Sequence, residues 1–289
     1  MYPLTDPNNL RQHAYADDEN FRIRHETHEQ YTVPRVDFRA WALSRIEWRG
    51  DEQVLDVGCG PGMYAASLRE MLPDVRYYGL DFSAGMLAKH PLPRAVTVGD
   101  GQNLPFPDHH FDVVMANHML YHVPDIERAL EEFRRVLKPD GVLLAATNSV
   151  ENMPQVRELF KRAILVLTAP GKAVSIPLPN SHLFTLESGT RQLSRHFYAV
   201  VRHDLPGALV FTEIEPVMAY LESTRSLREP LLPEGVTWES VMLVVREQIK
   251  NQLNYVGELV VHKLVGVLVA TDRGDFISDF LHQREDDGA

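Results

Sequence analysis

The stretch Val54-Leu55-Asp56-Val57-Gly58-Cys59-Gly60-Pro61-Gly62 decides the fold of this chain. Its first four residues, three of them apolar and β-favouring, predict a short buried strand. The three glycines that follow predict a turn without Cβ obstruction, whose backbone can approach a ligand closely. From Met63 to Leu72, apolar residues recur at spacings of three and four, which predicts a helix. A strand, a glycine turn and a helix in this order present backbone N–H groups at a helix N-terminus, the arrangement of a nucleotide-type site.

The spacing of the glycines distinguishes this turn from a dinucleotide site. The dinucleotide fingerprint is G-x-G-x-x-G, whereas this turn is G-x-G-x-G with Asp56 two residues before Gly58. The motif resembles that of class I S-adenosylmethionine-dependent methyltransferases, in the small-molecule, type 11-like group. The methionine end of that ligand carries an ammonium and a sulfonium, which suit a carboxylate, whereas a pyrophosphate does not. The resemblance implies cofactor contacts at Asp56, Gly58, Cys59, Gly60 and Gly62. The alternative is an ordinary strand-to-helix turn in another α/β protein.

A second acid follows at the end of the next predicted strand, residues 75–80. Asp81 lies about 20–25 residues past the glycine motif, where a carboxylate is placed to accept hydrogen bonds from ribose hydroxyls. The resemblance assigns the ribose to Asp81 and the adenine face to Phe82. Ser83 is a favourable N-cap for the next helix, in which Met86 is a further candidate cofactor contact.

A third acid, Asp100, follows the predicted strand 96–98. In the family that the chain resembles, this acid commonly receives the adenine amine, and backbone at the positions of Gly101 and Gln102 meets the ring. The alternative is a simple Gly/Asp turn, because Asp is common in turns. Acids at three successive strand ends support the cofactor interpretation more strongly than any one of them alone.

The fourth predicted strand, residues 111–116, is followed by Asn117, His118, Tyr121 and His122. Ligands of an open parallel sheet bind outside the carboxyl ends of the strands, so these residues should face the reacting methyl group. We assign Asn117 and His118 to the cofactor site, and name His118 and Tyr121 as catalytic candidates, with His118 as the candidate general base. The two histidines have metal-ligand spacing for a helix, but H-M-L-Y-H lacks the Glu of H-E-x-x-H and a third ligand is not evident. We therefore predict no metal.

Residues 126–137 are predicted to form a helix that ends at Lys138-Pro139-Asp140-Gly141, before a fifth strand over residues 142–147. The segment RRVLKPDGVLLAAT resembles the equivalent crossover of the family, so the resemblance covers about residues 50–150. The region lacks the N/D-P-P-Y tetrapeptide of methyltransferases that act on amino groups of nucleic-acid bases.

The predicted fold class is α/β: a Rossmann-like, doubly wound sheet that is mostly parallel with a final antiparallel strand, in three α/β/α layers with helical cap insertions. Extra material at residues 151–195 and 212–256 forms the predicted cap, and the last strand is residues 264–270. Tyr15 and Tyr31 belong either to a solvated surface helix or to a lid over the cofactor. The predicted domains are an N-terminal helical lid (1–36), an S-adenosylmethionine-binding core (37–150), the rest of the sheet with its cap insertions (151–283) and a disordered tail (284–289).

The composition of the chain indicates which classes of binding partner are unfavourable. The formal net charge of −11 is unfavourable for binding nucleic-acid phosphates. Cys59 is the only cysteine, so an intramolecular disulfide and a cysteine-based metal cluster are excluded. The N-terminal segment has no signal-peptide pattern, and no apolar run approaches the roughly 18–20 residues of a membrane span. We therefore expect a cytoplasmic protein with no membrane partner.

These observations predict an enzyme that moves the methyl group of S-adenosyl-L-methionine to an O, N or C nucleophile of a small molecule and releases S-adenosyl-L-homocysteine. Three alternatives are an RNA methyltransferase, a non-catalytic S-adenosylmethionine-binding protein and an NAD-type oxidoreductase. The net charge and the absent tetrapeptide oppose the first, and the glycine spacing with Asp56 opposes the last. The sequence does not indicate whether the protein is a monomer or a homodimer.

Overall fold

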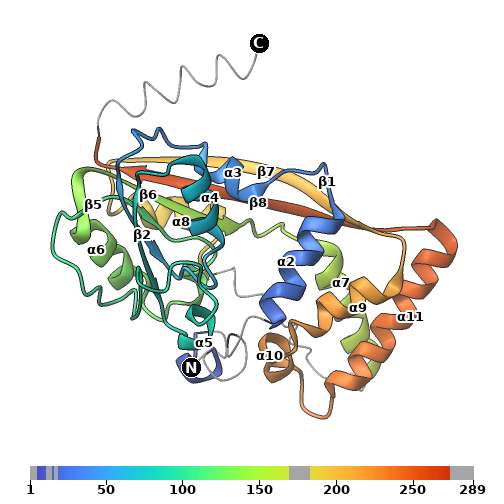
Figure 1. The fold of residues 1–289 in the computed structure, drawn as a ribbon. Helices are drawn as coiled ribbons and strands as arrows, with labels where there is room; N and C mark the ends of the chain where they lie inside the picture. The colour runs from blue at the N-terminus through green and yellow to red at the C-terminus, as the bar shows by residue number, and fades with distance from the viewer. Residues whose placement is uncertain (1–4, 11–14, 16–18, 169–182, 274–289) are drawn as a thin grey trace. The chain divides into compact units, whose positions relative to one another are not determined.

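The computed structural model describes residues 5–10, 15, 19–168 and 183–273 (Figure 1). The chain divides into two compact units. The sheet unit comprises Phe38–Val150, Leu183–Asp204 and Val265–Ala289, and the helical unit comprises Met1–Asp37, Glu151–His182 and Leu205–Leu264. The predicted disordered tail, residues 284–289, lies outside the described residues, as does part of the predicted lid.

Eight strands of the described chain form one sheet in the order β1-β7-β8-β6-β5-β2-β3-β4. The pairs β3–β4, β2–β3, β2–β5 and β5–β6 are parallel, and β8 pairs antiparallel with β6. The predicted doubly wound, mostly parallel sheet with a final antiparallel strand is therefore confirmed. The strands are β1 (Thr32–Val33), β2 (Gln53–Val57), β3 (Arg76–Asp81), β4 (Val96–Val98), β5 (Phe111–Met115), β6 (Leu137–Asn148), β7 (Ala199–Phe211) and β8 (Leu259–Thr271).

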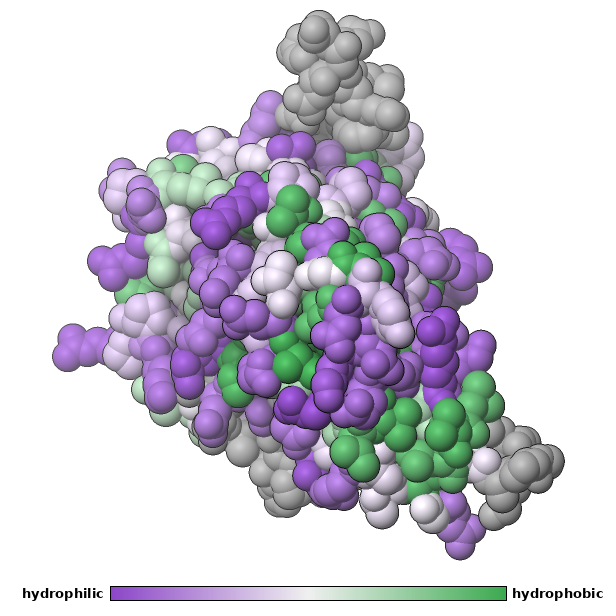
Figure 2. Space-filling model, turned by 90° about the vertical axis from the view of Figure 1, so that its right-hand side faces the viewer, coloured by the Kyte–Doolittle hydropathy of each residue, from purple (hydrophilic) through white to green (hydrophobic). Residues whose placement is uncertain are grey.

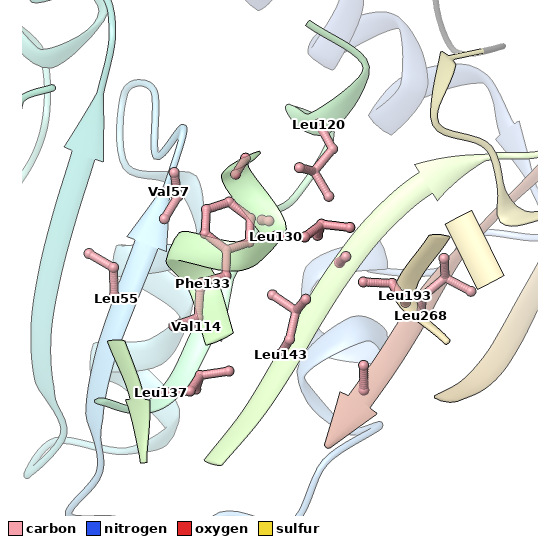
Figure 3. Close-up of a cluster of buried hydrophobic side chains, with 14 of the residues drawn as sticks. Leu55, Val57, Val114, Leu120, Leu130, Phe133, Leu137, Leu143, Leu193 and Leu268 are labelled. Carbon is pink, nitrogen blue, oxygen red and sulfur yellow. The ribbon is translucent and has the colours of Figure 1, made fainter. Parts of the chain in front are cut away.

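Helices cover both faces of the sheet in the sheet unit. Leu55, Val114 and Leu143 point to a core with α6 (Ile126–Val136) and α8 (Leu186–Leu193), as Figure 3 shows in part. Their neighbours Val54 and Val113 point to the opposite core, with α3 (Phe38–Leu43), α4 (Met63–Met71) and α5 (Ala84–Leu87). Adjacent strand residues point to opposite faces, so an apolar run fills both cores. The predicted three-layer arrangement follows from this pattern.

The helical unit has a core of its own. Buried side chains from α7, α9 and α11 meet there with others from β7 and β8, with Trp238 and Phe160 among the largest. No helix among the described residues is both long and apolar enough to span a membrane. The helices of this unit are α1 (Pro7–Asn9), α2 (Glu19–Tyr31), α7 (Pro154–Leu167), α9 (Ile214–Glu222), α10 (Arg225–Arg228), the 3₁₀ turn Glu229–Leu231 and α11 (Trp238–Val256).

The surface seen in Figure 2 is mainly hydrophilic, with apolar side chains gathered at one lower corner. The apolar side chains of the helical unit that are more than half exposed lie largely on α7 and α11. They are Val33, Leu165, Val166, Leu243, Tyr255 and Val256. These side chains contribute little to the core of the unit.

Several boundaries differ from the sequence prediction. The helix predicted for residues 126–137 ends at Val136, and residues 138–141 lie within β6. Between the pairs Phe111–Leu137 and Val113–Val142, β6 carries more residues than β5, so the predicted turn is a bulge in a continuous strand. The strand predicted at 264–270 is also longer, as β8.

Candidate functional site

The glycine turn begins where β2 ends, with β3 on one side of the strand and β5 on the other, both parallel to it. The strand order reverses at this point, which is where open α/β sheets bind ligands. Gly58, Gly60 and Gly62 have φ values of 71°, 54° and 83°, in the left-handed region that glycine adopts without a steric penalty. The N–H groups of Gly58 and Cys59 donate to the Leu80 carbonyl at 2.7 and 3.1 Å. The turn is therefore fastened to the end of β3.

Two methionines pack closely against this turn. A Cβ on Gly58 would lie 2.7 Å from the Cβ of Met119, and one on Gly60 would lie 3.3 Å from the Cε of Met86. A Cβ on Gly101 would lie 3.5 Å from the Cε of Met119. The structure therefore brings the predicted residues Gly58, Gly60, Met86 and Gly101 together. Met119 was missed, because its role depends on a chain crossing that sequence spacing does not give.

Asp81 connects the glycine turn to the start of α5. Its Oδ2 accepts a hydrogen bond from the Gly60 N–H and its Oδ1 accepts one from the Ser83 N–H, both at 2.8 Å. Burial raises the pKa of Asp81, and these backbone bonds oppose the rise. The prediction that Ser83 is the N-cap of this helix is confirmed, because its Oγ accepts a hydrogen bond from the Met86 N–H at 3.3 Å. Phe82, half-buried, lies between these anchored residues.

Asp56 lies beneath the turn in a buried polar chain. It is 2% exposed, and its Oδ2 accepts a hydrogen bond from the Tyr77 hydroxyl at 2.9 Å. The Tyr77 hydroxyl is also 3.3 Å from Nε2 of His90, whose Nδ1 accepts from the Leu92 N–H at 3.0 Å. This last bond assigns the proton of neutral His90 to Nε2, which donates to Tyr77. Burial raises the pKa of Asp56 to about 7 and lowers the pKa of His90.

The sequence did not indicate Tyr77 or His90 as part of this site. A Cβ on Gly62 would lie 2.6 Å from the His90 ring, so the chain of polar groups supports the glycine turn from below. Cys59 is also buried, and burial raises the pKa of its thiol, which is opposite to the shift of a nucleophilic cysteine. The predicted contact between Asp56 and the cofactor stays a prediction.

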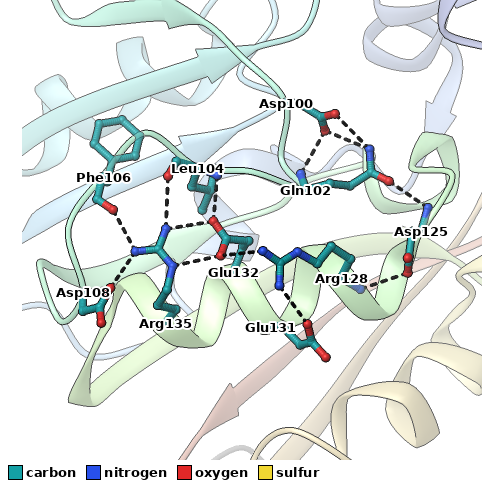
Figure 4. A network of polar contacts seen from close by, with 10 residues as sticks. All are labelled: Asp100, Gln102, Leu104, Phe106, Asp108, Asp125, Arg128, Glu131, Glu132 and Arg135. Carbon is teal, nitrogen blue, oxygen red and sulfur yellow. Dashed lines mark hydrogen bonds and ion pairs between the residues drawn. The ribbon is translucent and has the colours of Figure 1, made fainter.

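The segment after β4 is held by its own side chains (Figure 4). The backbone N–H and the side-chain amide of Gln102 both donate to Oδ1 of Asp100 at 2.9 Å. The Gln102 Oε1 accepts from the N–H of Asp125, which caps α6 through the Arg128 N–H. The Asp100 carboxylate thus fixes the loop, and α6 fixes it from the other side.

A buried ion pair on α6 holds the following residues. Glu132 accepts from the Leu104 N–H at 2.8 Å and from the Arg135 guanidinium at 2.8 Å (Figure 4). Arg135 also donates to the carbonyls of Leu104 and Phe106 at 3.1 and 2.9 Å. The hydrogen bond from Arg135 holds the pKa of Glu132 below its usual value. The segment predicted to frame the adenine is therefore anchored at both ends.

Asn117 and His118 follow the end of β5. The Asn117 Oδ1 accepts from the Ala146 N–H at 3.1 Å, and its Nδ2 is buried without a partner among the described residues. His118 donates its N–H to the Ala146 carbonyl at 2.9 Å and has a φ of 56°. Its ring lies 5.5 Å from that of Phe38. A non-glycine residue in the left-handed region is strained, and such strain concentrates at functional sites.

The remaining candidates have simpler surroundings. Tyr121 is half-buried in the 3₁₀ turn Leu120–His122 and packs against the core of the sheet unit. His118 precedes this turn, so His118 and His122 do not share an α-helix. Within the described ranges, no three His, Cys, Asp or Glu residues are grouped so that they could hold a metal ion.

The tyrosines of the predicted lid belong to the helical unit. The Arg24 guanidinium carbon lies 5.7 Å from the centroid of the Tyr15 ring. The ring centroids of Tyr31 and Phe211 lie 4.8 Å apart. Tyr31 thus packs against the core of its own unit. Whether these side chains cover a cofactor stays a prediction.

Comparisons with known proteins find similarity mainly in the sheet unit. Residues 55–145 match the family model described as a methyltransferase domain. Two curated relatives are a demethylmenaquinone methyltransferase of Lysinibacillus sphaericus and a malonyl-[acyl-carrier protein] O-methyltransferase of Xylella fastidiosa. The first is 34% identical over 40% of this chain and 57% of its own length, and the second is 27% identical over 52% and 50%. The chain thus spans about half the length of these relatives.

A solved structure is similar over more of the chain. The phosphoethanolamine N-methyltransferase 2 of Haemonchus contortus, in complex with phosphomonomethylethanolamine and S-adenosylhomocysteine, has a TM-score of 0.55. The two are 18% identical, and the match covers 92% of this chain and 59% of that one. At this identity the likeness concerns the fold.

Proposed function

We propose that this chain, whose residues 55–145 match the model of a methyltransferase domain, is a class I S-adenosylmethionine-dependent enzyme that transfers a methyl group to an O, N or C nucleophile of a small molecule. The glycine turn at the end of β2, fastened by the bond from Gly60 to Asp81, is the observation that carries the proposal. The three positive φ values let the backbone form a tight turn without side chains of its own, which fits the close approach of a nucleoside ligand.

The proposed cofactor is S-adenosyl-L-methionine, which leaves as S-adenosyl-L-homocysteine. Asp81 accepts from the ribose hydroxyls with its remaining lone pairs, and Phe82 covers the adenine. The backbone at Gly101 and Gln102 meets the adenine edge beside Asp100. The other proposed cofactor-binding residues are Asp56, Gly58, Cys59, Gly60, Gly62, Met86, Asn117 and His118.

The sulfonium of the cofactor supplies an activated methyl carbon, so the chain has chiefly to align the nucleophile in line and to exclude water. His118 lies at the end of β5, where the acceptor would approach, and a ring nitrogen there could take a proton from a nucleophile of high pKa. Tyr121 is the second candidate at this end. In this proposal the helical unit binds the acceptor, and the protein acts in the cytoplasm.

Calorimetric titration tests the cofactor first. S-adenosylmethionine and S-adenosylhomocysteine should bind with micromolar affinity, and NAD should not bind. Binding of NAD alone would replace the proposal with an oxidoreductase.

The role of Asp81 has its own test. Asp81→Ala should weaken S-adenosylmethionine binding by about 1–3 kcal/mol, because it removes the ribose acceptor and a support of the turn. Asp74→Ala, at an exposed acid before β3, is the matched control and should bind normally. Unchanged affinity in a folded Asp81 variant would overturn the assignment.

A further inference from the structure

Arg228, in the helical unit, has a guanidinium group that forms no ion pair with a carboxylate of the described residues. Its Nε donates to the Oγ1 of Thr224 at 3.1 Å, and its guanidinium carbon lies 4.8 Å from the centroid of the Phe160 ring. Its Nη1 is buried and has no hydrogen-bond partner in the described part of the chain. A buried donor without an acceptor destabilises the folded state. A fixed fork with one unused N–H is the geometry that binds an oxyanion.

A second arginine approaches the same place. The Nη1 of Arg24, on α2, donates to the carbonyl of Ser223 at 2.8 Å, and Ser223 precedes Thr224 at the end of α9. Two guanidinium groups are therefore anchored on adjacent residues. Both charges act on Tyr220, lowering the pKa of its phenol against the rise caused by burial. The Tyr220 hydroxyl itself donates to the sulfur of Met153, at 3.3 Å.

The positive charge of the nearby Arg225, in contrast, is neutralised by carboxylates. It forms ion pairs with Glu222, Glu229 and Glu239 at 3.6, 2.8 and 2.6 Å. The Oε2 of Glu222 accepts instead from the indole of Trp238. The carboxylates around α10 are thus turned to Arg225 and Trp238, and in the described residues no ion pair reaches Arg24 or Arg228.

This arrangement is electrostatically unfavourable without an anion. A buried arginine is normally paired with a carboxylate. The chain as a whole carries a net charge of −11, so acidic side chains are abundant but are not used here. A bound oxyanion would supply the missing negative charge and accept a hydrogen bond from Nη1.

We propose that Arg228 and Arg24 bind an anionic group, a carboxylate or a phosphate, of the methyl acceptor. This inference rests on the proposed function, in which the helical unit binds the acceptor. The acceptor is then an acid. Its anionic group binds to the helical unit, and its nucleophile is a different group of the same acceptor. Arg228 supplies the fork and Arg24 the second positive charge.

The test uses the full chain at low ionic strength and titrates benzoate, benzamide and inorganic phosphate by calorimetry. Benzamide is the uncharged match of benzoate. Arg228→Met keeps an apolar stem against Phe160 and removes the charge, and Arg225→Met is the control on the same helix. We expect benzoate or phosphate to bind the wild type and Arg225→Met at least tenfold more tightly than Arg228→Met, and benzamide to bind none of them.

The two anions distinguish the acceptor classes: preferred benzoate indicates a carboxylic acid, and preferred phosphate indicates a phosphate monoester. Equal anion binding by Arg228→Met, or no anion binding by the wild type, would overturn the inference. Arg24→Met, which leaves the contact with Phe160 intact, should also weaken anion binding and serves if Arg228→Met does not fold. S-adenosylmethionine is titrated in parallel: its failure to bind the wild type would sink the proposed function, whereas normal binding with no anion effect would sink only this inference.

Discussion

Gly58 is constrained both by its backbone and by its neighbour. Its φ of 71° disfavours any side chain, and a Cβ would lie 2.7 Å from the Cβ of Met119, which cannot move without its backbone. Gly58→Ala should therefore cost about 1–3 kcal/mol of unfolding free energy and weaken S-adenosylmethionine binding. Gly235→Ala is the matched control, because Gly235 has a φ of 81° but open space around its Cβ position. Urea denaturation should show the larger loss at Gly58, and equal losses would contradict the predicted clash.

Asp56 makes stability depend on pH in the neutral range. Burial raises its pKa from the usual value near 3.8 to about 7, so the folded state holds a proton that the unfolded state releases. The resulting stabilisation is complete below the unfolded pKa and disappears as pH rises through about 7. The wild type should thus lose up to about 4 kcal/mol relative to Asp56→Asn between pH 4 and 8. Denaturation curves of both proteins across this range measure the difference, and parallel pH profiles would show that Asp56 ionises normally.

The sequence predicted the positions of the acids but not their partners. Asp81 and Asp100 were recognisable because each comes at the end of a predicted strand, and Asp56 because it lies two residues before the first glycine of the turn. Tyr77 and His90 were not, because their contact with Asp56 depends on the register of β2 against β3 and on the path of the chain after α5. A tyrosine in a strand has many equally reasonable roles until that register is known.

At the level of elements, α6 and the loop over residues 100–106 behave as one structure through Glu132. Glu132→Gln should cost about 1–3 kcal/mol at neutral pH, because it weakens charge-assisted bonds to Arg135 and Leu104 in a buried site. Since the pKa of Glu132 is lowered in the folded state, its contribution is present above pH 4.5 and is lost as pH falls below that value. The difference in unfolding free energy between the wild type and Glu132→Gln should therefore become smaller in acid.

Glu131→Gln provides the control for this element, because the side chain of Glu131 is 56% exposed in its ion pair with Arg128. Such exposed pairs contribute roughly 0–1 kcal/mol. Thermal unfolding at pH 7 and pH 4 compares the two variants. An equal effect of the two substitutions would mean that the buried pair does not fix the loop.

The boundary between α6 and β6 shows where sequence patterns fail for an element. Lys138-Pro139-Asp140-Gly141 has the composition of a turn, yet the strand continues through it because Lys138 pairs with Asp112 at 2.8 Å and the neighbouring residues bulge. The capping box of α8, by contrast, is local, since the hydroxyl oxygens of Thr185 and Ser188 each accept a hydrogen bond from the other residue's backbone N–H. Local bonds are encoded in adjacent residues, whereas bulges depend on a partner strand.

At the scale of the whole molecule, the strands of the sheet unit were predictable one by one, whereas the helical unit was predicted only as a helical lid and cap insertions. The alternating burial of Val54 and Leu55 or of Val113 and Val114 follows from apolar runs that fill both faces of a sheet. The helical unit is assembled from three separated stretches of chain, none of which carries a motif. Its core depends on long-range packing that periodicity alone does not specify.

Because the chain divides into two units, we expect a substitution in the core of the helical unit to leave the proposed cofactor site of the sheet unit intact. Trp238 is 1% exposed, lies 5.7 Å from Phe160 between ring centroids, and donates its indole N–H to Glu222 at 2.8 Å. Trp238→Ala should therefore lower the unfolding free energy of the helical unit by about 3–5 kcal/mol. Tyr255→Ala, at an 89% exposed position of the same helix, should change stability by less than about 0.5 kcal/mol. Because the proposed cofactor residues all lie in the sheet unit, Trp238→Ala should keep its affinity for S-adenosylmethionine within about threefold, which is less than 1 kcal/mol. Urea unfolding and calorimetric titration below the transition measure both quantities, and a loss of affinity in proportion to the loss of stability would mean that the two units fold and bind as one.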